Sequence, residues 1–211
     1  CQILMLPGGF SAGDEPDGSG KFIATVFRNP ALADATLDLL DHRDGLLLGI
    51  CNGFQALVKL GLLPHGRIRP VDAASPTLTC NRIGRHVSCY VHTRICANHS
   101  PWLSLCRIGE VHTLPVSHGE GCFVADAETV DTLSAAGQIA TQYVDSEGRP
   151  SHHLSVNPNG SVHAIEGITS ADGRIFGKMA HTERAGPRIA RNISGNKIQP
   201  IFEAGVNYFS G

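Results

Sequence analysis

Residues 46–61, LLLGICNGFQALVKLG, decide the fold that we predict for this chain. The first five residues are an apolar run without alternation, which is typical of a strand covered on both faces in a parallel sheet. Phe54, Leu57 and Val58 then recur at i, i+3 and i+4, the spacing of one helix face. The stretch therefore predicts a buried strand, a tight turn and a helix, and indicates an α/β fold.

Cys51 stands in the turn itself, in the sequence Gly49-Ile50-Cys51-Asn52-Gly53. This is the G-x-nucleophile-x-G form of a nucleophile elbow, in which the glycines remove side chains that would clash with a strained turn. At the start of the following helix, free N–H groups and the helix dipole favour the thiolate, and the Asn52 N–H can donate to an oxyanion. A buried cysteine without chemistry is the alternative, which the elbow disfavours.

A thiol nucleophile needs a base and a group that orients the base. His181 has Glu183 two residues further on, so both side chains would face one site if the chain is extended there. His118 has a similar neighbour in Glu120. We predict a site built from Cys51, His181 and Glu183, against the alternative of a surface histidine beside a solvated carboxylate.

The rest of the chain predicts further strands and helices around this unit. Residues 3–6, ILML, predict a buried strand that runs into a loop rich in Gly, Pro and Asp. Residues 29–41 predict a helix with Asn29 as its cap and Pro30 in its first turn. We also expect a half-exposed strand over 85–95, a strand over 110–116, two strands joined at Asp172-Gly173, and a terminal helix within 196–209.

Composition excludes several classes of protein. With 211 residues and 42% hydrophobic residues, the chain fits about one domain, so we expect residues 1–211 to form a single domain. Its 17 basic and 19 acidic residues form no long runs, which argues against nucleic-acid and membrane-surface partners. Seven cysteines without a C-x-x-C pair indicate reduced thiols and a cytoplasmic protein. The scattered Cys and His residues lack zinc-finger spacing, so we predict no metal site.

Five stretches in chain order carry a resemblance to a known family: LPGGFSAGD, GICNGFQALVKLGLLP, PVSHGEG, NPNGS and GKMAHTER. They resemble the class I glutamine amidotransferase domain of phosphoribosylformylglycinamidine synthase, along nearly the whole chain. The resemblance implies a flavodoxin-like α/β fold: a mixed, mostly parallel sheet flanked by helices, with an antiparallel hairpin portion. The family domain begins with another strand and helix before ILML, and we expect these to be missing here. The stretches DEPDGSGKF and GNKIQPIFEAGVNYF are similar to the C-terminal domain of the large single-chain synthase, so we expect the chain to be that part of a larger enzyme.

The resemblance also implies roles for individual residues. It implies that Cys51 is the nucleophile, His181 the general acid and base, and Glu183 the group that orients His181. Where the family commonly has HPER, this chain has HTER, and we expect Thr182 in place of proline to have little chemical effect. The implied oxyanion and substrate-binding residues are Gly8, Gly9, Phe10, Asn52, Gln55, His118 and Glu120.

The activity implied by the resemblance is that of a glutamine-hydrolysing carbon–nitrogen ligase. L-glutamine would be cleaved through a cysteine thioester, and the ammonia would pass to a synthetase domain. That domain would use ATP and magnesium to convert formylglycinamide ribonucleotide to the amidine in purine biosynthesis, so no cofactor is expected in this chain. Two alternatives stay open: a cysteine hydrolase or peptidase of the same fold, and a silent domain kept for assembly. Gln55 and the H-x-E pair favour glutamine, and intact Cys51, His181 and Glu183 argue against a silent domain.

Overall fold

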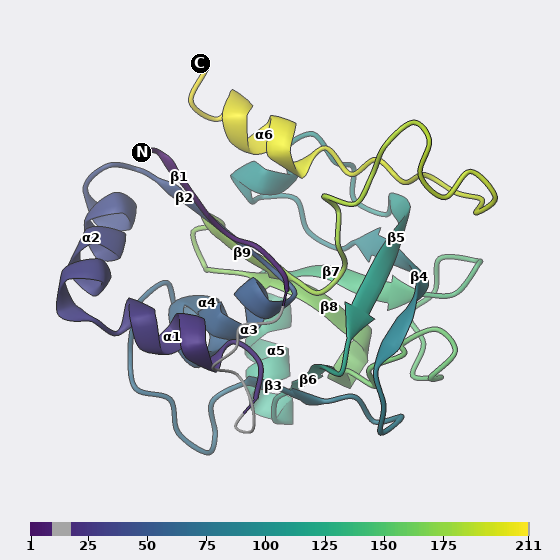
Figure 1. Cartoon of the computed structure of the whole chain (residues 1–211), viewed down its shortest axis with the longest axis horizontal. Coiled ribbons are helices and arrows are strands. Elements are labelled where there is room, and N and C mark those ends of the chain that lie inside the picture. Colours follow the sequence, from purple (N-terminus) through teal and green to yellow (C-terminus); the bar gives the residue numbers. More distant parts are fainter. Residues whose placement is uncertain (10–17, 211) are drawn as a thin grey trace.

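The computed structural model describes residues 1–9 and 18–210. Within this part of the chain, a seven-stranded sheet has the order β1-β2-β9-β8-β7-β4-β5 (Figure 1). A separate antiparallel pair is formed by β3 and β6. The strands are β1 Ile3–Leu6, β2 Leu46–Ile50, β3 Thr77–Cys80, β4 Val87–Ile95, β5 Val111–His118, β6 Glu120–Val124, β7 Ile139–Val144, β8 Ile165–Thr169 and β9 Ile175–Lys178.

The sheet is mixed and flanked by helices, which confirms the α/β prediction. Strands β1, β2 and β9 are parallel neighbours. The expected hairpin is present as β8 and β9, and antiparallel pairing extends beyond it through β7 and β4 to β5. Strand β2 is buried along its whole length between two parallel neighbours, as its unbroken apolar run predicts. Strand β1 lies at the sheet edge and buries only Leu6, so it is less buried than we expected.

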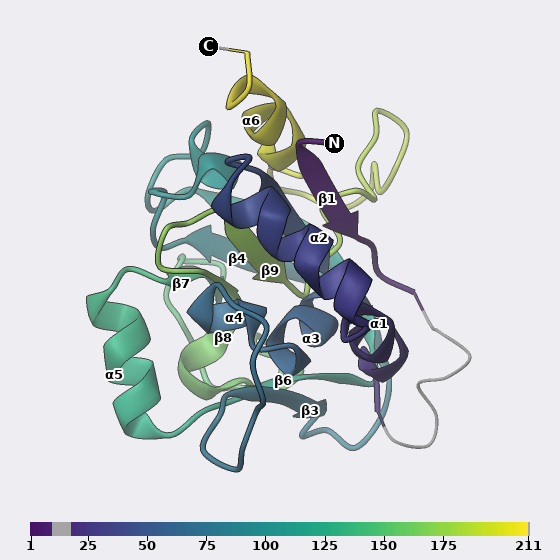
Figure 2. The same ribbon diagram turned by 90° about the vertical axis from the view of Figure 1, so that its left-hand side faces the viewer.

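Helices α1 to α4 lie on the side of the sheet that faces the viewer in Figure 2. In α2, the Asn29 side chain accepts a hydrogen bond from the Ala31 N–H, as the predicted cap requires. The C-terminal helix α6 is shorter than expected and starts after Pro200. None of the helices in the described residues is long and apolar enough to cross a bilayer. The α-helices are α1 Lys21–Phe27, α2 Pro30–Asp41, α3 Asn52–Lys59, α4 Leu62–His65, α5 Ala127–Ala135 and α6 Ile201–Asn207.

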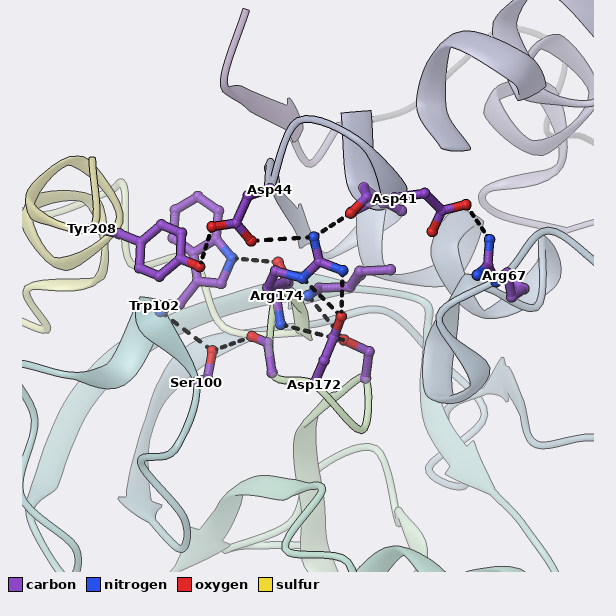
Figure 3. Close-up of polar contacts among 12 residues, drawn as sticks. Asp41, Asp44, Arg67, Ser100, Trp102, Asp172, Arg174 and Tyr208 are labelled. Carbon is purple, nitrogen blue, oxygen red and sulfur yellow. Dashed lines mark hydrogen bonds and ion pairs between the residues drawn. The ribbon is translucent and has the colours of Figure 1, made fainter. Parts of the chain in front are cut away.

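A cluster of polar side chains around Arg174 lies at the amino ends of β2 and β9 (Figure 3). The Arg174 guanidinium pairs with Asp172 at 2.8 Å and with Asp44 at 3.5 Å. Asp44 in turn accepts a 2.8 Å hydrogen bond from the Tyr208 hydroxyl, which follows α6. The Trp102 indole donates to the Arg174 carbonyl at 3.1 Å. This cluster lies at the opposite strand ends from Cys51 and joins the residue after the C-terminal helix to the loop before β2.

Candidate active site

The predicted elbow is present between β2 and α3. Cys51 has φ 52° and ψ −107°, a strained backbone conformation for a residue with a side chain. A Cβ on Gly53 would lie 2.0 Å from the Leu6 carbonyl oxygen, and a Cβ on Gly49 would lie 2.8 Å from the Gly53 carbonyl oxygen. Both flanking glycines are therefore required sterically, and the turn lifts Cys51 to the carboxyl end of the parallel strands.

His181 reaches the same edge because it follows β9, the parallel neighbour of β2. Its Nδ1 lies 2.5 Å from Glu183 Oε1, and its ring is 1% exposed. Burial alone would raise the pKa of Glu183, but the hydrogen bond and charge of His181 outweigh it and hold this pKa below its ordinary value. Since Nδ1 is engaged and Nε2 has no hydrogen-bond partner among the described residues, Nε2 is the ring atom that can exchange a proton.

Gly8, just after β1, lies close to both Cys51 and His181. A Cβ built on it would stand 2.6 Å from His181 Cε1 and 3.1 Å from Cys51 Cβ. Cys51 and His181 also line one pocket, which is partly open to solvent. A side chain at position 8 would therefore collide with the imidazole ring and crowd Cys51.

Most of the other predicted site residues line this pocket. Gly8 and Glu183 instead support His181 as described, and Phe10 lies outside the described residues. The structure thus brings together side chains from four separate parts of the sequence. The predicted residues that line the pocket are Gly9, Cys51, Asn52, Gln55, His118, Glu120 and His181.

Hydrogen bonds hold Gln55 and Glu120 in place at the pocket. The Gln55 amide donates to the Glu120 main-chain carbonyl at 2.6 Å. The Glu120 carboxylate accepts a 2.9 Å hydrogen bond from the Ser19 N–H. A long-range bond thus joins the segment before α1 to β6 and holds a carboxylate at the pocket.

His118 presents a neutral imidazole to the pocket. Burial, followed by the charges of His181 and His86, lowers its pKa to about 4. Its Nδ1 lies 3.1 Å from Asn81 Oδ1, and because that oxygen can only accept, we assign the proton to Nδ1. The His118 Nε2, which has no partner among the residues the structure describes, is then a hydrogen-bond acceptor.

The Cys51 side chain is held as a thiol. Burial raises its pKa to about 11, against the opposing effects of the Asn52 N–H and the charge of Arg184. The Sγ lies 3.8 Å from the Ser117 carbonyl oxygen, a suitable acceptor for a weak S–H hydrogen bond. The Asn52 N–H at the helix start favours the thiolate, as we expected, but desolvation outweighs this effect. For Cys51 to act as a nucleophile a base must remove this proton, and His181 lines the same pocket.

Sequence reasoning missed Arg184, which also lines the pocket. Arg184 directly follows the H-x-E pair, and this position was the sequence signal that could have identified it as a pocket residue. Its charge lowers the pKa of Cys51, in opposition to the raising effect of Glu183. With Arg184 and Glu120 on its walls, the pocket carries one cationic and one anionic group, which together match the charges of a free α-amino acid.

Away from the pocket, the described chain contains one group of side chains close enough together to hold a metal ion. Its members are Cys106, Glu110 and His112, whose donor atoms lie within 4.8 Å of one another. Glu110 already accepts a 3.3 Å hydrogen bond from the Asn196 amide. The positive charge of Lys178 acts on both Cys106 and His112. Because a nearby cation repels a divalent ion, we propose no metal site there.

Comparison with known proteins adds an independent line of evidence. The family model of the CobB/CobQ-like glutamine amidotransferase domain matches residues 1–209. The chain is 34% identical over 198 residues to phosphoribosylformylglycinamidine synthase subunit PurQ of Gloeobacter violaceus, covering 94% of this chain and 77% of that protein. It is 39% identical over 214 residues to the PurQ subunit of Synechococcus sp. strain JA-3-3Ab, covering 99% and 80%. The structure of PurLQS from Thermotoga maritima matches with a TM-score of 0.69 and 28% identity, over 98% of this chain and 79% of that chain.

Proposed function

This chain belongs to the family of CobB/CobQ-like glutamine amidotransferase domains, and we propose that it is the glutaminase of a phosphoribosylformylglycinamidine synthase. The observation that carries the proposal is that Cys51 and His181 both lie beside Gly8 and line one pocket, while Glu183 is hydrogen-bonded to Nδ1 of His181. This is the arrangement of nucleophile, base and orienting carboxylate that acyl transfer requires. Relatives named as PurQ subunits support the assignment to this synthase.

The proposed reaction begins with proton transfer from the Cys51 thiol to His181 Nε2. The resulting thiolate attacks the side-chain amide carbon of L-glutamine, and the Asn52 N–H donates to the developing oxyanion. His181 then gives the proton to the departing ammonia, which leaves a γ-glutamyl thioester. In the second half, His181 activates a water that releases glutamate and restores the thiol. Glu183 holds the ring and stabilises the imidazolium in both halves.

Charged groups on the pocket wall support glutamine as the substrate. We assign Arg184 to the α-carboxylate and Glu120 to the α-ammonium group of the free amino acid. Gln55, His118 and Gly9 would complete the substrate-binding wall. A peptide substrate carries neither terminal charge at this position, so the two charged residues argue against a peptidase.

We further propose that the ammonia is delivered to a synthetase partner. Such a partner would hold ATP and magnesium and convert formylglycinamide ribonucleotide to formylglycinamidine ribonucleotide, so this chain needs no cofactor of its own. The matched Thermotoga maritima structure is that of PurLQS, and the similarity to it supports an assembly with other components. That residues 1–211 form a single domain, and that it is the C-terminal part of a larger synthase, stay predictions.

The glutaminase proposal is tested by covalent trapping with an electrophilic glutamine analogue and peptide mass spectrometry. We expect one adduct on Cys51, blocked by excess L-glutamine and absent from Cys51→Ala. Cys122→Ala is the matched control, since Cys122 is also buried but lies outside the pocket, and it should label like the wild type. The proposal would be contradicted if other cysteines were labelled as fast as Cys51, or if Cys51 were not labelled at all.

The assignment to this synthase is tested separately. The chain is combined with a phosphoribosylformylglycinamidine synthetase partner, ATP, magnesium and formylglycinamide ribonucleotide. We expect glutamine-dependent formation of the amidine, which Cys51→Ala abolishes and free ammonium restores. Ammonium-dependent product without any glutamine-dependent product would show that this glutaminase serves another acceptor.

A further inference from the structure

A fully buried ion pair lies beneath the segment that carries His181. Lys178, the last residue of β9, has its Nζ 3.7 Å from Oε1 of Glu166 on the adjacent strand β8, and both side chains are 0% exposed. Removing two charges from water is costly, and a buried pair of this kind commonly adds little stability compared with apolar residues. Packing alone therefore does not explain the pair, and its other contacts indicate what it does.

Three hydrogen bonds of this pair go to the residues on either side of His181, and a fourth joins Glu166 Oε2 to the Thr141 hydroxyl on β7. Lys178 Nζ donates to the Ala180 carbonyl at 3.0 Å and to the Thr182 hydroxyl at 2.7 Å. Glu166 Oε1 accepts the Ala180 N–H at 2.6 Å. Both peptide groups of Ala180 are thus engaged, and so is the side chain of Thr182. The pair thus holds the main chain before His181 and the Thr182 side chain after it.

The main chain of Lys178 also connects this network to the nucleophile. Its carbonyl accepts a 2.8 Å hydrogen bond from the Cys51 N–H. On the other side of the network, the Thr182 hydroxyl donates to Gln199 Oε1 at 2.8 Å, and Gln199 is 2% exposed just before α6. The network therefore runs without a break from the elbow, under the His181 segment, to the C-terminal part of the chain.

We propose that Lys178, Glu166 and Thr182 are positioning residues for the glutaminase reaction, which fix the His181 segment so that Nε2 faces Cys51 while Nδ1 stays on Glu183. The proposal rests on the proposed function for its kinetic readout. In this proposal the Thr182 hydroxyl accepts a hydrogen bond from Lys178 and donates one to Gln199. These hydrogen bonds restrain the turn at a position where the family commonly has a rigid proline ring.

The central test replaces Thr182 with valine, which keeps the shape and removes the hydroxyl. The measurement is the saturation kinetics of inactivation by an electrophilic glutamine analogue, which separates the limiting rate constant from the apparent affinity. We expect Thr182→Val to lower the limiting rate about 10-fold, because a shift of the base by roughly 1 Å can cost up to about 100-fold. The apparent affinity should change less than about twofold, because Thr182 does not line the pocket.

Two further variants separate positioning from general stability. Thr182→Ser retains the hydroxyl and should restore the rate to within about twofold of the wild type. Thr169→Val is the matched control: Thr169 is also fully buried, and within the described chain its hydroxyl has no hydrogen-bond partner. It should leave the rate unchanged. Melting temperatures are recorded for all variants so that rates refer to folded protein.

The outcomes distinguish this inference from the proposed function. If the wild type fails to react at Cys51, the proposed function itself is wrong. If the wild type reacts but folded Thr182→Val reacts equally fast, or Thr182→Ser is as slow as Thr182→Val, the positioning role is overturned. Should Thr182→Val not fold, Gln199→Met decides in the same way. It removes the acceptor of the Thr182 hydroxyl, and an unchanged limiting rate in that variant overturns the inference.

Discussion

Replacing Gly8 with alanine tests the central feature of the site, the packing of Cys51 and His181 beside a residue without a side chain. The added methyl would lie 2.6 Å from His181 Cε1 and 3.1 Å from Cys51 Cβ. Carbon atoms in contact normally stay about 3.5 Å apart or more, so relief requires a shift of roughly 1 Å. Because His181 is only 1% exposed, we expect that shift to move its ring relative to the thiol or to distort the elbow.

The expected result follows from this displacement. A base misplaced by about 1 Å can cost around 100-fold in rate, so we expect the limiting rate of Cys51 inactivation by an electrophilic glutamine analogue to fall by about that factor. Overpacking a buried contact typically costs about 1–3 kcal/mol, so the variant should fold with a reduced free energy of unfolding in urea. A lower limiting rate of inactivation in a variant that still folds would support the assigned geometry.

Gly119→Ala is the matched control for this experiment. Gly119 lines the same pocket, but a Cβ built on it has no described atom within 4 Å and its backbone is not in the left-handed region. Any effect of that methyl should appear in the apparent affinity, and the limiting rate should stay within about threefold of the wild type. A Gly8→Ala protein that keeps the wild-type limiting rate would refute the assigned geometry of nucleophile and base.

Three further predictions concern stability. Gly53→Ala should destabilise the fold by about 3 kcal/mol or more in urea unfolding, because its Cβ would lie 2.0 Å from the Leu6 carbonyl oxygen; near-normal stability would exclude the elbow as described. Burial lowers the His118 pKa from 6.5 to about 4, so the unfolded chain binds a proton at this residue more readily than the folded chain does. The free energy of unfolding should therefore fall by up to about 3 kcal/mol as the pH drops from about 6.5 to 4. In pH-dependent melting, His118→Gln should lose this part of the slope, whereas exposed His153→Gln should keep it. Arg174→Leu should lower the unfolding free energy by about 2–3 kcal/mol, since it breaks the cluster of Figure 3; a loss below about 0.5 kcal/mol would show that the cluster adds little.

Local sequence determined the elements that depend on neighbouring residues. The apolar run of β2, the helix cap at Asn29 and the hairpin at Asp172-Gly173 were all predicted from short patterns, and the structure confirms each of them. The elbow around Cys51 was equally predictable, because the glycines that permit a strained turn lie within two residues of the thiol. These features follow from backbone sterics and side-chain periodicity, which act over a few residues.

Tertiary structure alone decided how these elements meet. The sequence indicated Cys51 and His181, but the parallel pairing of β2 with β9 and the placement of Gly8 close to both residues depend on contacts between distant segments. The same holds for the high pKa of Cys51, since desolvation is a property of the packed surroundings and overrides the local effect of a helix start. The network around Lys178 was invisible in sequence because its partners lie on different strands, and charge pairing across a sheet has no local pattern.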